Sequence, residues 1–199
     1  MRVLALDIST CTGWALLEGE PGQLPKILKT GIIQVDKVEG AYPWNFVARC
    51  FDATSQMLTL TKELAPDLVV IEEVNMGKAR FSQKVLDWLH CLYLFPLWKE
   101  GSVLPVKYVN TSDWRRKLGA TLTKEDKKLN AKVRALKKAG NKEGLRALGV
   151  RGKIGKKHVA IRYVNQTFGL QLRAKDDDIA DAICEGCAWF LGVQICDGK

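Results

Sequence analysis

The spacing of apolar residues changes near residue 43, and this change limits what the chain can fold into. Before it, short apolar runs at 3–8, 12–17 and 29–35 are separated by turn-prone residues, which predicts three strands. After it, residues 44–64 and 81–98 have helical spacing and alternate with strand-like runs at 68–71 and 103–109. We therefore predict an α/β domain whose mixed central sheet is flanked by helices.

One domain accounts for residues 1–199, because this length suffices for one full hydrophobic core. We expect further helices at 156–168 and 177–191, and Pro96 ends or bends the helix at 81–98. Residues 120–154 are rich in Lys and contain glycines that interrupt any long helix, so we expect a basic insertion of two short helices. The order of the elements is typical of a ribonuclease H-like fold.

The positive charge of the chain, net +9, is concentrated in one segment. Between Arg115 and Lys157 there are sixteen Lys and Arg against three Asp and Glu, so the remainder is net negative. Such segregation favours a polyanionic partner such as nucleic acid. On charge alone, a solvated Lys-rich helix face is an equally good interpretation.

Two acidic positions lie at the ends of predicted apolar strands. Asp7 interrupts the run LALDIST, where an ionised carboxylate is costly unless it is paired or binds a metal; the structural alternative is a residue that caps the following turn. Glu72 and Glu73 end the run LVVIEE. Because side chains alternate along a strand, only one of the two can join Asp7. A polar strand end is the structural alternative for this pair.

A third acidic position is the segment DDDIADAIC. Asp178 and Asp181 are three residues apart and therefore share one helix face. The helix dipole explains Asp176 or Asp177 but not an acid in the second turn among Ile and Ala, so we favour metal binding. Carboxylates gathered from separate elements suit Mg²⁺, and Mn²⁺ is expected to substitute. Two such ions about 3.5–4 Å apart can hydrolyse a phosphodiester.

These segments match a known family in the same order along the chain. ALDISTCTGWALLE resembles the first two strands of RuvC-type Holliday-junction resolvases, IEEVNMGKA resembles their fourth-strand exit, and DDDIADAICEG resembles their C-terminal helix. The resemblance implies a homodimeric, Mg²⁺-dependent endodeoxyribonuclease. Its substrates would be four-way junctions and other branched DNA, cut to leave 5′-phosphate and 3′-hydroxyl ends.

The resemblance also assigns roles to single residues. Glu73 matches a non-catalytic position, and Lys157 matches a catalytic basic residue at the scissile region, with Lys156 as the alternative. The family's four catalytic metal-binding acids correspond to Asp7, Glu72, Asp178 and Asp181. The candidates for DNA binding lie near the strand exit or beside the insertion: Asn75, Lys78, Arg80, Phe81, Arg115, Arg116, Lys117, Lys153, Lys156 and Lys157.

The chain departs from the family at two places. Bacterial members carry an aromatic wedge three residues after the strand-exit Glu, whereas this chain has Asn75. Asn is a poor wedge, so we expect recognition of branched DNA by shape unless Phe81 takes over the role. The second departure is the basic insertion, to which the family assigns no function.

Three other interpretations compete with a nuclease. An actin-like sugar kinase or ATPase also begins with an Asp-bearing strand, but it needs two domains and usually a glycine-rich phosphate turn. A non-catalytic branched-DNA or RNA-binding protein leaves Asp7 and Asp181 unexplained. Cys184 and Cys187 form a CxxC, for which a zinc site would recruit further ligands: His90 or His158. Because a second paired motif is missing, we assign both cysteines to the core.

For Glu185 and the cysteines, the sequence favours structural roles. Glu185 is interpreted as a partly exposed helix residue, with an outer-shell contact as the alternative. The six cysteines are scattered through apolar segments, which suits buried thiols in a reducing cytoplasm, host cytoplasm in the case of a phage protein. No apolar run approaches the roughly 20 residues that span a membrane, and Asp7 interrupts the N-terminal run, so neither membrane association nor export is expected.

Overall fold

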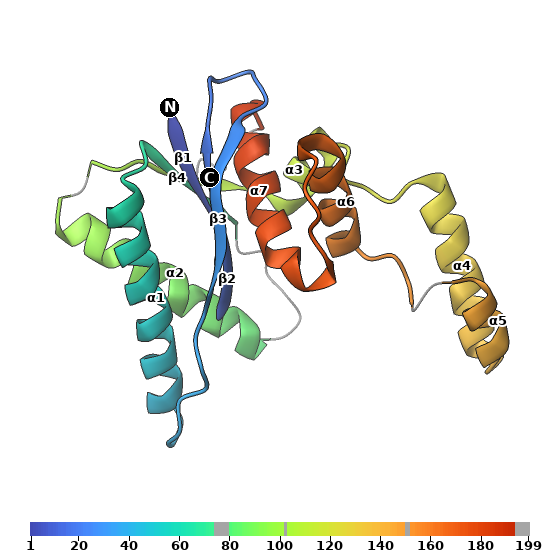
Figure 1. The fold of residues 1–199 in the computed structure, drawn as a ribbon. Coiled ribbons are helices and arrows are strands. Elements are labelled where there is room, and N and C mark those ends of the chain that lie inside the picture. Colours follow the sequence, from blue (N-terminus) through green and yellow to red (C-terminus); the bar gives the residue numbers. More distant parts are fainter. Residues whose placement is uncertain (74–79, 102, 150–151, 194–199) are drawn as a thin grey trace.

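A mixed sheet forms the centre of the computed structural model, which describes residues 1–73, 80–101, 103–149 and 152–193 (Figure 1). Its strands run in the order β3-β2-β1-β4-β5. β1 is antiparallel to β2, and β2 to β3, whereas β4 is parallel to both β1 and β5. This is a ribonuclease H-like sheet, as the sequence predicts. The bounds are β1 (Arg2–Asp7), β2 (Cys11–Glu18), β3 (Lys26–Gln34), β4 (Leu68–Glu72) and β5 (Val106–Val109).

Helices cover both faces of the sheet (Figure 1). One face carries α1 (Trp44–Leu64) and α2 (Arg80–Lys99). The other carries α3 (Thr111–Lys117), α6 (Lys156–Phe168) and α7 (Asp177–Phe190), the last preceded by the 3₁₀ turn η1 (Ala174–Asp176). Each face therefore encloses its own hydrophobic core.

Successive side chains of β1 and β4 enter these two cores in turn. The core under α7 receives Val3, Ala5, Leu68 and Val70. The core under α1 and α2 receives Leu4, Leu6, Val69 and Ile71. Continued to the ends of the strands, the same alternation places Asp7 and Glu72 on the α7 side. Because β1 and β4 are parallel neighbours, both acids reach the same edge of the sheet.

α7 lies unusually close to β2, at a position that only glycine permits. A Cβ on Gly13 would lie 2.1 Å from the carbonyl oxygen of Asp178. Gly13 is also the cross-strand partner of Asp7. The first turn of α7 is thereby held against the strand end that carries Asp7.

The insertion forms the two helices expected of it, α4 (Lys124–Lys138) and α5 (Lys142–Ala147), which we call the basic arm. The arm extends away from the sheet in Figure 1. At its base, Asp126 accepts two hydrogen bonds from Arg162 of α6, at 3.1 and 2.7 Å. Asn130 exchanges two more with the backbone of Ile154, at 2.9 and 2.8 Å. The arm is thus attached by specific polar contacts.

Some element boundaries differ from the predictions. α2 continues past Pro96 to Lys99, since a proline in the last turn removes only one backbone donor from the helix. β5 begins at Val106 rather than Val103, whose side chain is 95% exposed. Gly144 lies inside α5 instead of interrupting it.

The remaining predictions from composition concern the state of the cysteines and membrane-spanning segments. Every cysteine in the described ranges is free, and the buried ones are Cys50, Cys184 and Cys187. Among the described residues, no helix combines the length and the apolar character needed to cross a membrane.

Candidate active site

A cleft of about 470 Å³ opens where β1 and β4 end beside α3 and α7. All four acids assigned to metal binding line it, and so does Lys157. The described residues around it are Asp7, Ile8, Ser9, Glu72, Glu73, Leu86, His90, Thr111, Arg115, Lys157, Asp178 and Asp181. The cleft therefore gathers carboxylates from three elements that are distant in sequence.

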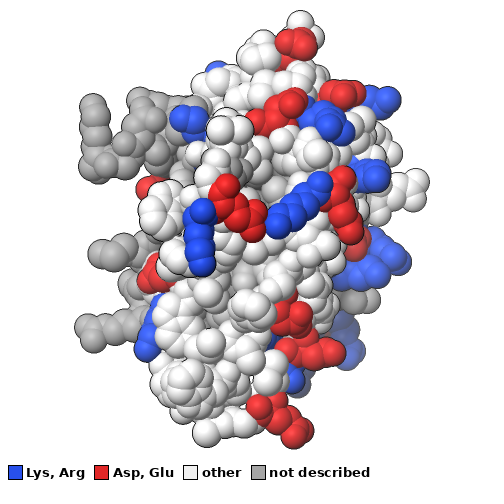
Figure 2. Space-filling model, turned by 90° about the vertical axis from the view of Figure 1, so that its left-hand side faces the viewer, with Lys and Arg blue, Asp and Glu red and all other residues white. Residues whose placement is uncertain are grey.

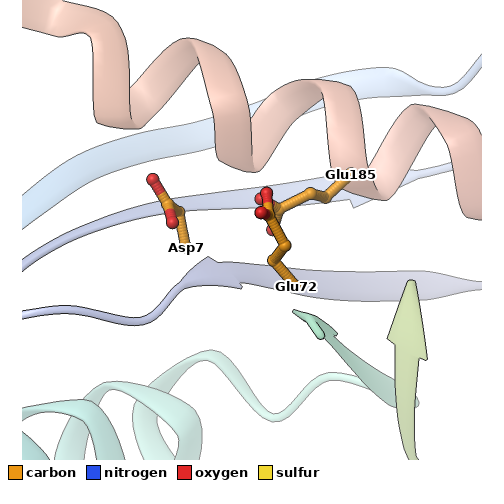
Figure 3. Close-up of side chains that lie close together, drawn as sticks. All are labelled: Asp7, Glu72 and Glu185. Atoms are coloured by element: carbon orange, nitrogen blue, oxygen red, sulfur yellow. The ribbon is translucent and has the colours of Figure 1, made fainter. Parts of the chain in front are cut away.

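Two of these acids form a compact cluster with a third, fully buried carboxylate, that of Glu185. One oxygen each from Asp7, Glu72 and Glu185 lies within 4.8 Å of the other two. Figure 3 shows Asp7 and Glu72 at the ends of their strands and Glu185 reaching toward them from α7. Donors of this kind and spacing suit a hard divalent cation such as Mg²⁺.

Glu72 and Glu73, at the end of β4, have different partners, as the alternation of side chains along a strand predicts. Glu72 joins Asp7, and its carboxylate accepts hydrogen bonds from the Thr111 hydroxyl and, at 3.3 Å, from the Trp114 indole. Glu73 lines the same cleft but accepts a hydrogen bond from the Asn110 amide at 3.0 Å. Only Glu72 is part of the compact cluster.

Asp178 and Asp181 of α7 are each paired with a basic side chain. Asp178 accepts a hydrogen bond from Lys157 at 2.8 Å, and Lys157 also pairs with Asp177 at 2.7 Å. Asp181, which is 6% exposed, accepts one from Arg115 at 2.9 Å. Both aspartates therefore line the cleft but stand outside the compact cluster of Asp7, Glu72 and Glu185.

Negative charge dominates the electrostatics of the cleft. Burial, followed by the charges of Glu72 and Asp181, raises the pKa of Asp7 well above its usual value. Burial also raises the pKa of Asp181 to about 6, although Arg115 opposes the shift. Burial opposes the charge on Lys157, but its bonds to Asp177 and Asp178 outweigh this and raise its pKa. More positive charge is needed to keep all the acids ionised at neutral pH.

Glu185 is the site residue that the sequence interpretation assigned wrongly. It was expected to be partly exposed, but its relative exposure is 0% and its carboxylate faces the cluster. Its spacing from Asp178 and Asp181, seven and four residues, puts all three on one helix face and was the available signal. That the third turn of α7 is buried depends on packing against the sheet, which spacing does not reveal.

The candidates for DNA binding other than Lys157 fall into four groups. Arg116, Lys117, Lys153 and Lys156 are exposed. Arg115 is instead buried, bonded to Asp181 and to the backbone of Lys156, with its guanidinium 4.0 Å from the Trp114 ring centre. Phe81 is 50% exposed and packs edge to face on Phe46. Asn75, Lys78 and the side chain of Arg80 lie outside the described residues.

The CxxC pair does not form a metal site with described residues. Cys184 and Cys187 are buried in the core under α7, and burial raises the pKa of both thiols, that of Cys187 to about 12. His90 contacts the Tyr108 hydroxyl at 3.0 Å, and His158 is exposed at the start of α6. Within the described ranges, the cluster suited to a metal is the acidic one.

Comparisons by structure find similar proteins where comparisons by sequence do not. No protein-family model and no curated protein sequence matches the chain. The structure of Thermus thermophilus RuvC in complex with a Holliday junction substrate matches with a TM-score of 0.63 at 14% identity, over 94% of this chain and 92% of that one. Another structure of T. thermophilus RuvC matches with a TM-score of 0.60 at 16% identity, over the same shares. The yeast mitochondrial Holliday junction resolvase Ydc2 matches with a TM-score of 0.55 at 12% identity, over 96% and 79%. The likeness extends over nearly the whole chain, so this protein has the ribonuclease H-like fold of the RuvC resolvases.

Proposed function

We propose that this protein is a Mg²⁺-dependent endonuclease that cleaves Holliday junctions and other branched DNA. The observation that carries the proposal is the acidic cleft. Asp7 and Glu72 come together with the face of α7 that bears Asp178 and Asp181, on the fold of the RuvC resolvases. The products would be 5′-phosphate and 3′-hydroxyl ends.

The residues of the cleft fit a divalent metal. Asp7, Glu72, Asp178 and Asp181 would hold Mg²⁺, or Mn²⁺ in its place, since hard cations prefer carboxylate oxygens. Buried Glu185 has no hydrogen-bond donor among the described residues, as expected where a cation neutralises the cluster. Such ions activate water and stabilise the charge that develops on a phosphodiester during hydrolysis.

The chain's own side chains would orient the ligands and the substrate. Thr111 and Trp114 fix the Glu72 carboxylate, and Arg115 fixes that of Asp181. Lys157 lies at the cleft with 54% of its side chain exposed, so its ammonium is placed to pair with a phosphate of the scissile strand. We therefore assign Lys157 to substrate positioning beside the metal site.

Basic residues beside the cleft would bind the DNA arms. Arg116, Lys117, Lys153 and Lys156 are exposed, and the basic arm adds a row of exposed lysines: Lys124, Lys127, Lys128, Lys132, Lys137 and Lys138. The side of the molecule turned away from the arm carries mixed charges and broad uncharged areas instead (Figure 2). This distribution favours DNA entering from the side of the arm. A homodimer would present two such sites to the two strands cut in a four-way junction.

The cleft argues against the other candidate functions. A non-catalytic DNA-binding or RNA-binding protein gains nothing from carboxylates that repel phosphates at the centre of its surface. An actin-like kinase needs a glycine-rich phosphate turn, whereas no glycine is among the described residues that line this cleft.

A nuclease assay with Mg²⁺ on four-way, three-way, flap and linear DNA tests the proposal. We expect cleavage of the branched substrates that EDTA abolishes. Asp7→Asn removes a ligand charge and keeps the shape, so cleavage should fall by orders of magnitude while junction binding persists. Near-normal activity of Asp7→Asn, or no cleavage of any branch by the wild type, would refute the proposal.

A further inference from the structure

Glu185 is a buried acid without a partner. It lies in the third turn of α7 with a relative exposure of 0%, and neither of its carboxylate oxygens accepts a hydrogen bond from a donor in the described residues. Burying an unpaired carboxylate costs several kcal/mol. A side chain in this state indicates that something else compensates its charge.

Four other acids, which line the cleft, differ from Glu185 in this respect. Asp181 is bonded to Arg115, Asp178 to Lys157 and Glu73 to Asn110. Glu72 accepts from Thr111 and Trp114. The protein thus supplies donors to these carboxylates and leaves Glu185 with only the neighbouring acids Asp7 and Glu72 (Figure 3).

Two arrangements would make such a cluster stable. A proton on Glu185 would let it donate a hydrogen bond to Glu72, or a divalent cation would lie among the three carboxylates. The spacing within 4.8 Å permits oxygens of all three to reach one ion with small adjustments, since Mg²⁺ to oxygen distances are about 2.0–2.1 Å. The proton would leave Asp7 without compensation, because Asp7 has no described cation as close as those of Asp178 and Asp181.

We propose that Glu185 is a fifth acidic metal ligand, which together with Asp7 and Glu72 holds a divalent cation beside the cleft. Asp178 and Asp181, which line the same cleft and pair with Lys157 and Arg115, then complete the binding of metal there. This assignment rests on the metal dependence of the proposed function. It adds a ligand to the four acids that the sequence suggested.

Mn²⁺ binding to Glu185→Gln, measured by titration calorimetry and by the electron paramagnetic resonance signal of free Mn²⁺, tests the assignment. Gln has nearly the same shape and keeps an N–H that can donate to Glu72, so it preserves a hydrogen-bonding role but removes the anionic ligand. We expect at least a tenfold loss of Mn²⁺ affinity, because loss of a direct ligand should cost no less than the roughly 10–100-fold typical of a changed outer-shell partner. Without metal, Glu185→Gln should have a higher Tm than the wild type, because one repelling charge is gone. The rise in Tm caused by Mn²⁺ should shrink.

Two variants serve as controls. Glu73→Gln removes a charge from the same cleft outside the compact cluster and should bind Mn²⁺ like the wild type. Glu185→Asp keeps the charge on a shorter side chain, so its affinity should lie between those of the wild type and Glu185→Gln. It also provides the measurement if Glu185→Gln does not fold.

The outcomes separate this assignment from the proposed function. Wild-type affinity in Glu185→Gln, with weakened binding in Asp7→Asn, would overturn the role of Glu185 and leave a nuclease with four acidic ligands. Binding of Mn²⁺ that depends on Glu185 in a protein that cuts no branched DNA would overturn the nuclease and leave the metal site. A wild-type protein that binds no Mn²⁺ would overturn the assignment.

Discussion

The acid cleft and the basic arm each have a buried carboxylate beside them or within them, Glu185 and Asp126, and the fold pairs only the second. Asp126 of the arm is 5% exposed and accepts two hydrogen bonds from Arg162 and one from the Thr123 backbone. Buried Glu185 accepts none from the described residues. The arm satisfies its buried charge from within the chain, whereas we propose that a cation from outside compensates Glu185. Asp126 therefore serves as an anchor, and Glu185 is a proposed metal ligand.

The largest expected effect is a difference in cleavage rate between variants of two neighbouring acids of the cleft. Glu72→Gln should reduce cleavage of a four-way junction by orders of magnitude, because Glu72 belongs to the compact cluster. Glu73→Gln should keep most of the activity, since Glu73 is bonded to Asn110 instead. Single-turnover cleavage rates with Mg²⁺ measure both. An inactive Glu73→Gln beside an active Glu72→Gln would reverse the assignment of the strand end.

Removing the arm should affect binding rather than chemistry. Replacing residues 120–154 by a short linker should weaken junction affinity by at least about tenfold and flatten its salt dependence, since each lost phosphate contact reduces the log–log slope by about 0.9. Cleavage at saturating DNA should change little. Neutralising exposed Lys128 and Lys132 with Gln is the milder control, because it leaves the anchor of the arm intact. An unchanged salt slope would show that the arm does not contact phosphates.

The two regions should also respond to pH in opposite directions. Arg162 and the Thr123 backbone hold the pKa of Asp126 well below its usual value. The anchor therefore stabilises the fold fully above the unfolded-state pKa of about 3.9, and this stability is lost as the pH falls below it. The pKa of Asp181 is raised to about 6, so without metal its ionisation costs stability as the pH rises from about 3.9 to about 6.

Urea unfolding in EDTA between about pH 3 and pH 7 measures both effects. Asp126→Asn should lose about 1–3 kcal/mol of stability at neutral pH, in line with hydrogen bonds to charged groups, and this loss should diminish in acid. Asp181→Asn should flatten the decline between about pH 4 and pH 6. Parallel pH profiles for the two variants would contradict the contrast between the regions.

The smallest expected effect concerns the selectivity between branches. Phe81 packs on Phe46 at a ring distance of 4.9 Å and is half exposed, so it retains an apolar surface that a separated base pair can stack on. If neither it nor another side chain acts as a wedge, three-way and four-way junctions should be cut about equally well. Phe81→Ala and Asn75→Phe, compared on the branch panel, test this. Strong four-way selectivity that disappears in Phe81→Ala would identify Phe81 as the wedge.

The sequence predicts the parts of the site that depend on local periodicity. Strand alternation places Asp7 and Glu72 on one side, and helical spacing places Asp178 and Asp181 on one face. Contacts between distant elements are not predictable in this way. Arg115, expected to bind DNA, turns inward because α3 packs against α7, which brings its guanidinium to Asp181.

The same limit applies to the residues that hold the ligands. Thr111 and Trp114 reach Glu72 across about forty positions of sequence, a relation that no local pattern encodes. The boundaries of α1 and α6, by contrast, follow from apolar spacing and agree with the structure. Local rules thus identify which acids are available, and tertiary packing determines which side chains hold them.

Because Gly13 packs on the backbone of Asp178, a substitution at this uncharged residue would change the distances between the acids. Asp178, Asp181 and Glu185 belong to one helix and move together, whereas Asp7 and Glu72 belong to the sheet. A methyl group at residue 13 would push the helix off the sheet and widen the gap between the two sets of acids without altering any of them. Mutational tolerance at this strand position should therefore follow the permitted separation of the acids, and any substitution of this glycine should favour a wider site.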